Sequence, residues 1–190
     1  MGKYDKYFLK GVQPWYEDAP GPTVMHMDDT HMKGSHYYFV HWVLKAPTGM
    51  PGLDAWGEIS HGPHIHKDAE LLFHIGTNPD DPMDLGAEVE LYMGEELEKH
   101  VITESCVVYI PPGFVHCPWR IKKVDRPWLF IEVNQGPLHT EKSYPQLVSE
   151  EDRKKMLFFD ERYGEGTKIV LPEGITTQHE GVWVTPDKDK

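Results

Sequence analysis

Apolar and polar side chains alternate along short segments of this chain, which is the pattern of half-buried β-strands. The segment 36–45 is instead apolar at nearly every position (HYYFVHWVLK), which predicts a strand buried on both faces or placed in a subunit interface. Further strands are expected at 56–60, 70–75, 88–93, 100–103, 107–110, 119–124 and 128–134. Turn signals rich in Gly and Pro separate nearly all of them, and short strands at this spacing predict a sandwich or barrel.

The two ends of the chain differ from this strand-rich middle. Residues 1–35 are rich in Pro, Gly, Met and His and show weak periodicity, so we interpret them as an N-terminal arm that wraps a core. The barrel is expected to cover 36–135, and a C-terminal extension follows at 136–190. One short helix is expected in the extension, because Ser149 can cap a segment whose first turn carries three acidic residues.

Composition agrees with one globular domain that is mostly β. The 190 residues suffice for an ordinary domain, and 17 Gly with 16 Pro favour many turns over a helical bundle. The 19 Lys+Arg against 31 Asp+Glu give a net charge of −12, which disfavours nucleic acid and anionic membranes as partners. Because the sequence shows neither an apolar span nor a secretory signal, we expect a cytoplasmic protein with Cys106 and Cys117 reduced.

Two histidines and a carboxylate can share one face where the chain is extended between residues 64 and 70. Side chains alternate along an extended chain, so His64, His66 and Glu70 can converge on one point inside a barrel. Two imidazoles and a carboxylate suit Fe(II), Mn(II), Ni(II) or Zn(II). The chain has 12 histidines, however, and two of them can also fall two residues apart by chance. The spacing alone leaves both interpretations open.

A second segment points to the same site. The run PPGFVH at 111–116 turns the chain at its Pro-Pro-Gly corner, so that His116 can enter the barrel as a fourth ligand. Together the two segments resemble the motifs of the cupin superfamily, Gly-x5-His-x-His-x3,4-Glu-x6-Gly and Gly-x5-Pro-x-Gly-x2-His-x3-Asn. The motif positions are matched by His64, His66, Glu70, Pro111, Gly113 and His116. The chain departs from the motif Gly and Asn positions at Glu58, Thr77, Ser105 and Arg120.

The resemblance covers about residues 36–135 and implies a double-stranded β-helix, or jelly roll, with a metal inside the barrel. It implies a divalent transition metal, Fe(II) or Mn(II) in preference to Ni(II) or Zn(II), with two coordination positions left open for water, oxygen or a chelating substrate. The implied ligands are His64, His66, Glu70 and His116. Cupins commonly pair through sheet edges and exchanged arms, and the segment 36–45 is too apolar for an exposed edge, so we expect a homodimer.

Two further residues are candidates for catalysis. His74 lies an even number of residues after Glu70, so its side chain can point to the same face, into the barrel interior. There it can act as an acid or base, or it can be a hydrogen-bonded structural histidine. Arg120 shares parity with His116 and can bind a substrate carboxylate through two parallel hydrogen bonds. The alternative for Arg120 is a position on the protein surface.

The sequence supports two classes of function. The leading hypothesis is a metal-dependent enzyme acting on a small polar molecule, carboxylated or enolisable, with Glu132 or Asn134 lining the cavity. Oxygenase chemistry is favoured over decarboxylase, lyase or isomerase chemistry by the resemblance alone. The alternative is a metal-containing binding or sensing module without turnover. An accessible cavity with His74 or Arg120 directed at the metal would favour the enzyme, whereas a barrel filled by Trp and Phe would favour the binding module.

Overall fold

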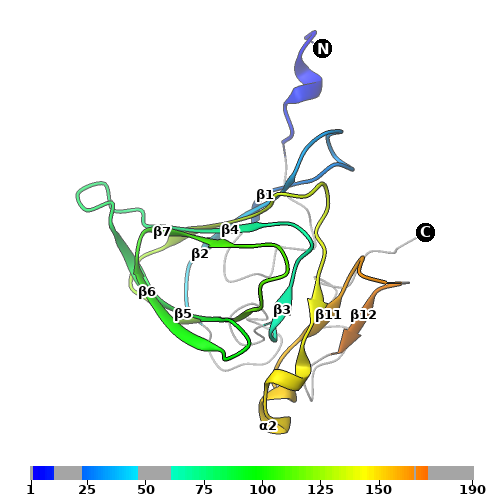
Figure 1. The fold of residues 1–190 in the computed structure, drawn as a ribbon. Coiled ribbons are helices and arrows are strands. Elements are labelled where there is room, and N and C mark those ends of the chain that lie inside the picture. Colours follow the sequence, from blue (N-terminus) through cyan, green and yellow to red (C-terminus); the bar gives the residue numbers. More distant parts are fainter. Residues whose placement is uncertain (1, 11–22, 47–60, 165, 171–190) are drawn as a thin grey trace.

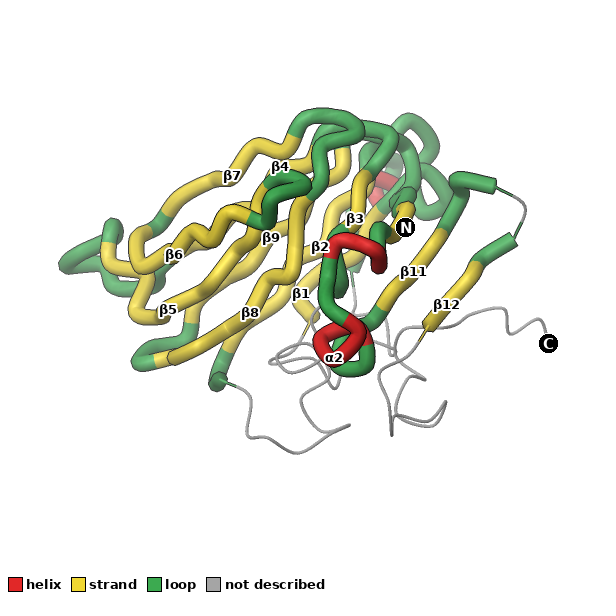
Figure 2. The backbone as a smooth tube through the Cα atoms, turned by 60° about the horizontal axis from the view of Figure 1, so that its bottom comes forward, coloured by secondary structure: helices red, strands yellow, loops and turns green. Residues whose placement is uncertain are grey.

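Two five-stranded antiparallel sheets face each other and enclose the core of the barrel (Figures 1 and 2). The computed structural model describes residues 2–10, 23–46, 61–164 and 166–170. The first sheet has the order β1-β2-β9-β4-β7 and the second the order β10-β3-β8-β5-β6. Their bounds are β1 Thr23–Met27, β2 Tyr37–Val43, β3 His64–Ile65, β4 Glu70–Ile75, β5 Asp84–Met93, β6 Glu98–Glu104, β7 Cys106–Ile110, β8 His116–Val124, β9 Trp128–Asn134 and β10 Lys142–Ser143.

The strand order is that of a jelly roll. From β2 to β9 the chain passes back and forth between the two sheets, except at the β5–β6 hairpin, so that β2-β9-β4-β7 faces β3-β8-β5-β6. The expected all-β double-stranded β-helix is therefore confirmed. Each sheet also gains one edge strand from outside this core, β1 from the region interpreted as an arm and β10 from the C-terminal extension.

The remaining elements are short and lie in the two flanking regions. They are η1 Asp5–Tyr7, η3 Pro145–Leu147, α2 Glu150–Arg153, β11 Phe158–Asp160 and β12 Lys168–Val170. The helix begins where the sequence predicts, because the Ser149 hydroxyl accepts a hydrogen bond from the Asp152 backbone N–H at 3.1 Å. It ends after one turn, and buried Met156 and Leu157 follow it instead of extending it.

Most expected strands form close to the predicted positions. The strands predicted at 70–75 and 128–134 match β4 and β9 residue for residue. The strand expected at 56–60 lies outside the described residues. The apolar segment at 36–45 contains β2, which lies between β1 and β9 and is therefore an interior strand rather than an edge. The strand is therefore not an exposed edge, as its apolar character predicts, and the oligomeric state stays a prediction.

The barrel interior has an apolar end and a polar end. In β4, Leu72 and His74 point inward, and both are buried beside Trp128 and Phe130 of β9. Trp128 is fully buried, and removing such a side chain from water contributes about 2–3 kcal/mol to folding. At the start of β4, Glu70 is buried instead, so the polar groups gather at that end.

Both cysteines lie on strands of the barrel. Cys106 is exposed on β7 and Cys117 is buried on β8, and both are free thiols. Within the described ranges, none of the helices is both long and apolar enough to cross a bilayer.

Candidate metal centre

Three histidine side chains converge inside the polar end of the barrel. His64 begins β3, His66 follows it in the next loop, and His116 begins β8 directly opposite His64 in the register of the sheet. One nitrogen of each ring lies within 4.8 Å of the corresponding nitrogen of the other two. All three side chains are buried. The cross-strand pairing of β3 with β8 thus joins the two sequence motifs at one point.

Each of these imidazoles is held through Nδ1 by a main-chain carbonyl. His64 Nδ1 donates to the Gly62 carbonyl oxygen at 2.8 Å, and His116 Nδ1 lies 3.3 Å from the Phe114 carbonyl oxygen. His66 Nδ1 donates to the Thr140 carbonyl oxygen. A carbonyl can only accept, so Nδ1 carries a proton and Nε2 is the atom that each ring can offer to a metal. This is the usual way in which a protein orients histidine ligands.

The carboxylate of Glu70 completes the group from the side of the first sheet. Its Oε2 lies 2.9 Å from His116 Nε2, and its Oε1 lies 3.3 Å from His66 Nε2. Despite these distances, Glu70 Oε2 and His66 Nε2 make no hydrogen bond among the described residues. The atoms are therefore close without pointing at one another, as expected for ligands that share an ion. Asn134 fixes the carboxylate by donating from Nδ2 to Glu70 Oε1 at 2.9 Å.

The buried Glu70 carboxylate attracts positive charge to this group. Burial opposes ionisation of Glu70, but the His66 and His116 charges hold the pKa of this carboxyl well below its usual range. Burial would also lower the pKa of His66, but the Glu70 carboxylate raises it to about 9. Three imidazole nitrogens and one carboxylate are a suitable donor set for Mn(II), Fe(II), Ni(II) or Zn(II). The predicted quartet is thus brought together as a possible His₃Glu metal site.

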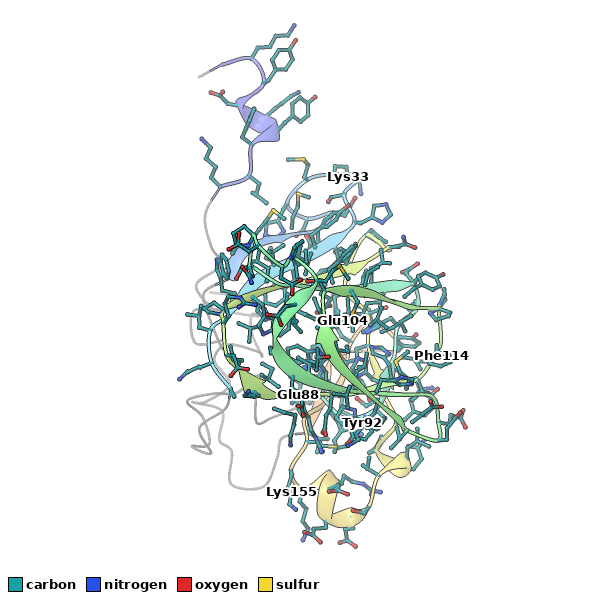
Figure 3. All side chains as sticks on the ribbon, turned by 90° about the vertical axis from the view of Figure 1, so that its left-hand side faces the viewer. Lys33, Glu88, Tyr92, Glu104, Phe114 and Lys155 are labelled. Atoms are coloured by element: carbon teal, nitrogen blue, oxygen red, sulfur yellow. The ribbon has the colours of Figure 1, made fainter. Side chains whose placement is uncertain are left out.

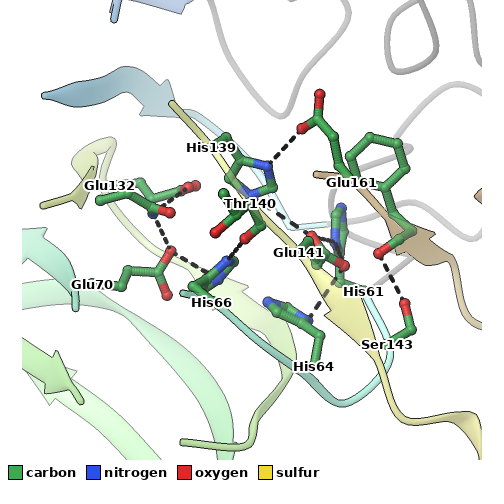
Figure 4. Close-up of polar contacts among 12 residues, drawn as sticks. His61, His64, His66, Glu70, Glu132, His139, Thr140, Glu141, Ser143 and Glu161 are labelled. Carbon is green, nitrogen blue, oxygen red and sulfur yellow. Dashed lines mark hydrogen bonds and ion pairs between the residues drawn. The ribbon is translucent and has the colours of Figure 1, made fainter. Parts of the chain in front are cut away.

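A second carboxylate lies on the other side of the histidine group. Glu141 is 1% exposed, and both of its oxygens lie 3.1 Å from His61 Nδ1. One oxygen also lies 3.6 Å from His64 Nδ1, and the other 3.8 Å from His139 Nε2 (Figure 4). His61, His64 and Glu141 form a second group of possible ligands. The partners of this buried charge that the structure describes are thus histidines.

Sequence reasoning missed His61, His139 and Glu141. They belong to neither motif, and His61 meets Glu141 across 80 residues of chain. Only the folding of the C-terminal extension against the barrel brings them together. The one available signal was the presence of further histidines and glutamates near the motifs, which alone does not indicate a contact.

A third carboxyl group lies beside Glu70. Glu132 Oε1 is 3.4 Å from the same Asn134 Nδ2 that holds Glu70. Burial, together with the Glu70 charge, raises the pKa of Glu132 well above its usual range. Of these two neighbouring carboxyl groups, Glu132 is therefore the one that takes up a proton more readily. The expectation that Glu132 and Asn134 face the cavity agrees with this placement.

The structure does not bring His74 to the metal centre. It lies four residues beyond Glu70 along β4, which is about 13 Å of extended chain. Its Nε2 accepts a hydrogen bond from Trp119 Nε1 at 3.0 Å, and its ring stacks on Trp128 with centroids 5.4 Å apart. Burial lowers the pKa of His74 to about 4. This placement favours the structural alternative for His74.

Arg120 also lies away from the metal centre, although the alternation of side chains along the strand predicted that it would point to the same face as His116. The register between β5 and β8 shifts after His116, where Cys117 has a φ of +73°. Trp119 and Ile121 consequently turn inward and are buried, while the Arg120 guanidinium lies outside, 5.7 Å from the centre of the Tyr92 ring. The expectation that Arg120 shares a face with His116 is corrected by this irregularity.

Comparisons with known proteins find only solved structures of low identity to this chain. No family model and no curated protein matches the chain. Among solved structures, the DMSP lyase DddQ from Ruegeria pomeroyi DSS-3 is 22% identical over 55% of this chain and 40% of its own, with a TM-score of 0.33. The chain therefore spans less than half of that lyase. An oxalate oxidase in complex with the substrate analogue glycolate is 11% identical over 78% of this chain and 68% of its own, with a TM-score of 0.46.

A third solved structure is an uncharacterised double-stranded β-helix protein from Klebsiella pneumoniae. It is 12% identical over 74% of this chain and 93% of its own, with a TM-score of 0.37. The fold assignment itself follows from the order of the strands. The fold is a double-stranded β-helix. The double-stranded β-helix that the motif resemblance implies is thus confirmed by the strand order. The chemistry of the site has to be argued from its own residues.

Proposed function

We propose that this protein is a metal-dependent enzyme that acts on a small polar substrate bound at the polar end of the barrel. The proposal rests on one observation above all, the convergence of three buried imidazoles whose Nδ1 atoms are all held by carbonyl groups. Fe(II) or Mn(II) is the favoured ion, held by the three histidines and Glu70. Such an ion supplies a Lewis acid for a chelated oxygen, or a binding position for dioxygen beside the substrate.

The residues around the ligands supply positioning and a proton. Asn134 donates its amide protons toward Glu70 and Glu132, and so keeps the two carboxyl groups apart and in fixed orientations. Glu132 holds a proton at its carboxyl group, in position to donate to a substrate oxygen or, once ionised, to accept a proton. The aromatic side chains fill the other end of the barrel, which limits the substrate to a small molecule. A carboxylated or enolisable compound has the oxygen donors that such a site binds.

The ligand assignment is tested by metal content. Protein purified anaerobically without an affinity tag or chelators is expected to contain about one equivalent of iron or manganese by elemental mass spectrometry. His116→Ala should lower the bound metal several-fold with the fold retained, as judged by circular dichroism. His100→Ala is the matched control, because His100 is a half-exposed histidine paired with Glu98 on β6. Equal metal in all three proteins contradicts the assignment.

The reaction class is tested on the loaded protein. Oxygen consumption and carbon dioxide release are followed with small mono- and dicarboxylic acids, because oxygenase chemistry, which we favour, consumes oxygen and decarboxylase chemistry releases carbon dioxide. Glu132→Gln should lower turnover by about 10²–10⁴-fold while leaving metal content unchanged. Unchanged turnover in this variant would remove Glu132 from the reaction.

The second candidate is a non-catalytic binding or sensing module. It is favoured by the aromatic packing of the barrel and by the positions of His74 and Arg120, neither of which lies at the metal centre. Binding of a small carboxylic acid by the metal-loaded protein, measured by calorimetry, with no product formed over hours would support this candidate over the enzyme.

A further inference from the structure

The C-terminal extension contains a pocket outside the barrel. Its volume is about 280 Å³, at the lower end of the range for small-molecule sites, and β10, η3, α2, β11 and β12 all contribute to it. The residues that line it are Ser143, Pro145, Arg153, Phe158, Asp160, Lys168 and Val170. None of them belongs to the proposed metal site. We refer to this cavity as the extension pocket.

The apolar part of the extension pocket is held in place from behind. Phe158 is buried, and a Cβ placed on Gly62 would lie 2.0 Å from its ring, so the ring packs directly on the Gly62 main chain. Val170, at the end of β12, is 44% exposed, and Pro145 begins η3. A fixed ring beside an open apolar side chain offers apolar contact to a ligand with little reorganisation of the protein.

Two exposed cations of the pocket, Arg153 and Lys168, form no ion pair with a carboxylate among the described residues. Arg153 instead donates from Nε to the Pro145 carbonyl oxygen at 3.1 Å and from Nη2 to the Val148 carbonyl oxygen at 3.5 Å. These carbonyl groups orient the guanidinium but leave its charge unneutralised. Six other Lys and Arg side chains do pair with carboxylates, namely Lys33, Lys99, Lys123, Arg126, Lys155 and Arg162.

The carboxylate that lines the pocket does not cancel the charge of both cations. Asp160 Oδ1 accepts a hydrogen bond from the Ser143 backbone N–H at 2.7 Å, which commits part of this carboxylate to the main chain. Asp160 lies opposite Lys168 in the register of β11 and β12, so it can balance one cation and not two. The lining residues therefore keep an excess of positive charge in a chain whose net charge is −12. Such an excess attracts an anion to the pocket.

We propose that the extension pocket binds a small carboxylate that carries a short apolar group. The ligand's carboxylate lies toward Arg153 and Lys168. Arg153 can offer it two parallel hydrogen bonds, because two of its five N–H donors bond to the carbonyl groups and three remain. The ligand's apolar group lies against Phe158, Pro145 and Val170. Because the pocket shares no residue with the metal site, this proposal stands apart from the proposed enzyme activity.

Isothermal titration calorimetry of the full chain tests the proposal with matched ligands. Phenylacetate and isobutyrate are the probes, and phenylacetamide is the control that has the shape of phenylacetate without its charge. Phenylacetate should bind about 10-fold more tightly than phenylacetamide. Arg153→Gln and Lys168→Gln should each weaken phenylacetate binding by about 5-fold. Lys155→Gln should leave it unchanged, because Lys155, which lies beside α2 in Figure 3, is paired with Glu151 at 2.9 Å.

A variant of the metal site separates the two places where a carboxylate can bind. His116→Ala should lose most of its metal, yet it should bind phenylacetate in the extension pocket with the wild-type affinity. Because the metal content of His116→Ala is measured on its own, failure of the pocket proposal and failure of the proposed enzyme give different results.

Three outcomes would overturn the proposal. The first is that neither phenylacetate nor isobutyrate binds at tens of millimolar. The second is equal affinity for phenylacetate and phenylacetamide, which would show that the site does not select an anion. The third is equal phenylacetate affinity in the wild type, Arg153→Gln and Lys168→Gln, which would place the ligand elsewhere. Loss of binding in His116→Ala would then assign the ligand to the metal centre.

Discussion

The buried histidine of β4 makes the stability of this protein depend on pH in a way that can be calculated. His74 is fully buried between Trp128, Phe130 and Trp119, and burial lowers its pKa from 6.5 to about 4. Its register neighbour on the adjacent strand is Cys106. Above pH 6.5 the ring is neutral in both the folded and the unfolded chain. As pH falls, the unfolded chain takes up a proton near 6.5, whereas the folded chain resists it until about 4.

Acid therefore favours the unfolded chain in this window. His74 alone is expected to remove about 2 kcal/mol of unfolding free energy between pH 7 and pH 5, and about 3 kcal/mol by pH 4, from a 1.36 kcal/mol value per pKa unit. A Gln at position 74 does not titrate but still offers an acceptor to the Trp119 Nε1–H. His74→Gln should therefore lose less stability on acidification than the wild type by these amounts, whatever its stability at pH 7.

Urea unfolding followed by tryptophan fluorescence at pH 7 and pH 5 measures the difference. Other buried histidines, among them His41, whose pKa burial lowers to about 3, contribute equally to both proteins and cancel in the comparison. Equal losses of unfolding free energy in the wild type and His74→Gln would refute the reasoning, because they would show that the ring is protonated in the folded protein. A larger loss in the variant would refute it as well.

Three further outcomes follow from the metal centre. Glu141→Gln should weaken metal binding by about 10–100-fold in a chelator competition, because a buried negative charge beside His64 is lost. The control is Glu161→Gln, whose partners are His139 and Arg162, and it should leave metal binding unchanged. Removing metal with a chelator should lower the unfolding free energy, and restoring manganese to 100 times its dissociation constant should raise it by about 2.7 kcal/mol, read as a rise in Tm. Gly62→Ala should cost about 1–3 kcal/mol in urea unfolding, since its Cβ would lie 2.0 Å from the buried Phe158 ring; an unchanged midpoint contradicts that packing.

The alternation of side chains along a single strand predicted which of them face the barrel interior only where the strand pairs without register shifts. It placed Glu70 inside the barrel correctly, because β4 pairs without interruption on both sides. It failed for Arg120, because a register shift after His116 reverses the faces of β8. The Pro after Cys117 was visible in the sequence, but how the chain would absorb it is decided by pairing with β5. A register shift depends on how two strands pair, so the sequence of either strand alone gives little indication of it.

Apolar runs identified buried strands but not their positions in the sheets. Segment 36–45 was expected to be apolar on both faces, and β2 does carry buried residues on both. Its outward residues, however, belong to a face that continues over four other strands. Each of those strands contributes two or three apolar residues in an ordinary alternating pattern. A surface spread so thinly along the chain becomes visible only after the strand order is known.

The metal centre illustrates how a motif and its surroundings come from different parts of the chain. The ligand histidines come from the barrel, but the carbonyl that holds His66 belongs to Thr140, and the carboxylate beside His64 belongs to Glu141. Both lie in the C-terminal extension, next to β10, which pairs with β3. Docking of this extension therefore fixes two of the three imidazoles. A chain truncated before residue 136 keeps every motif residue yet loses these two supports, so we expect it to bind metal more weakly than the full chain even if its barrel folds.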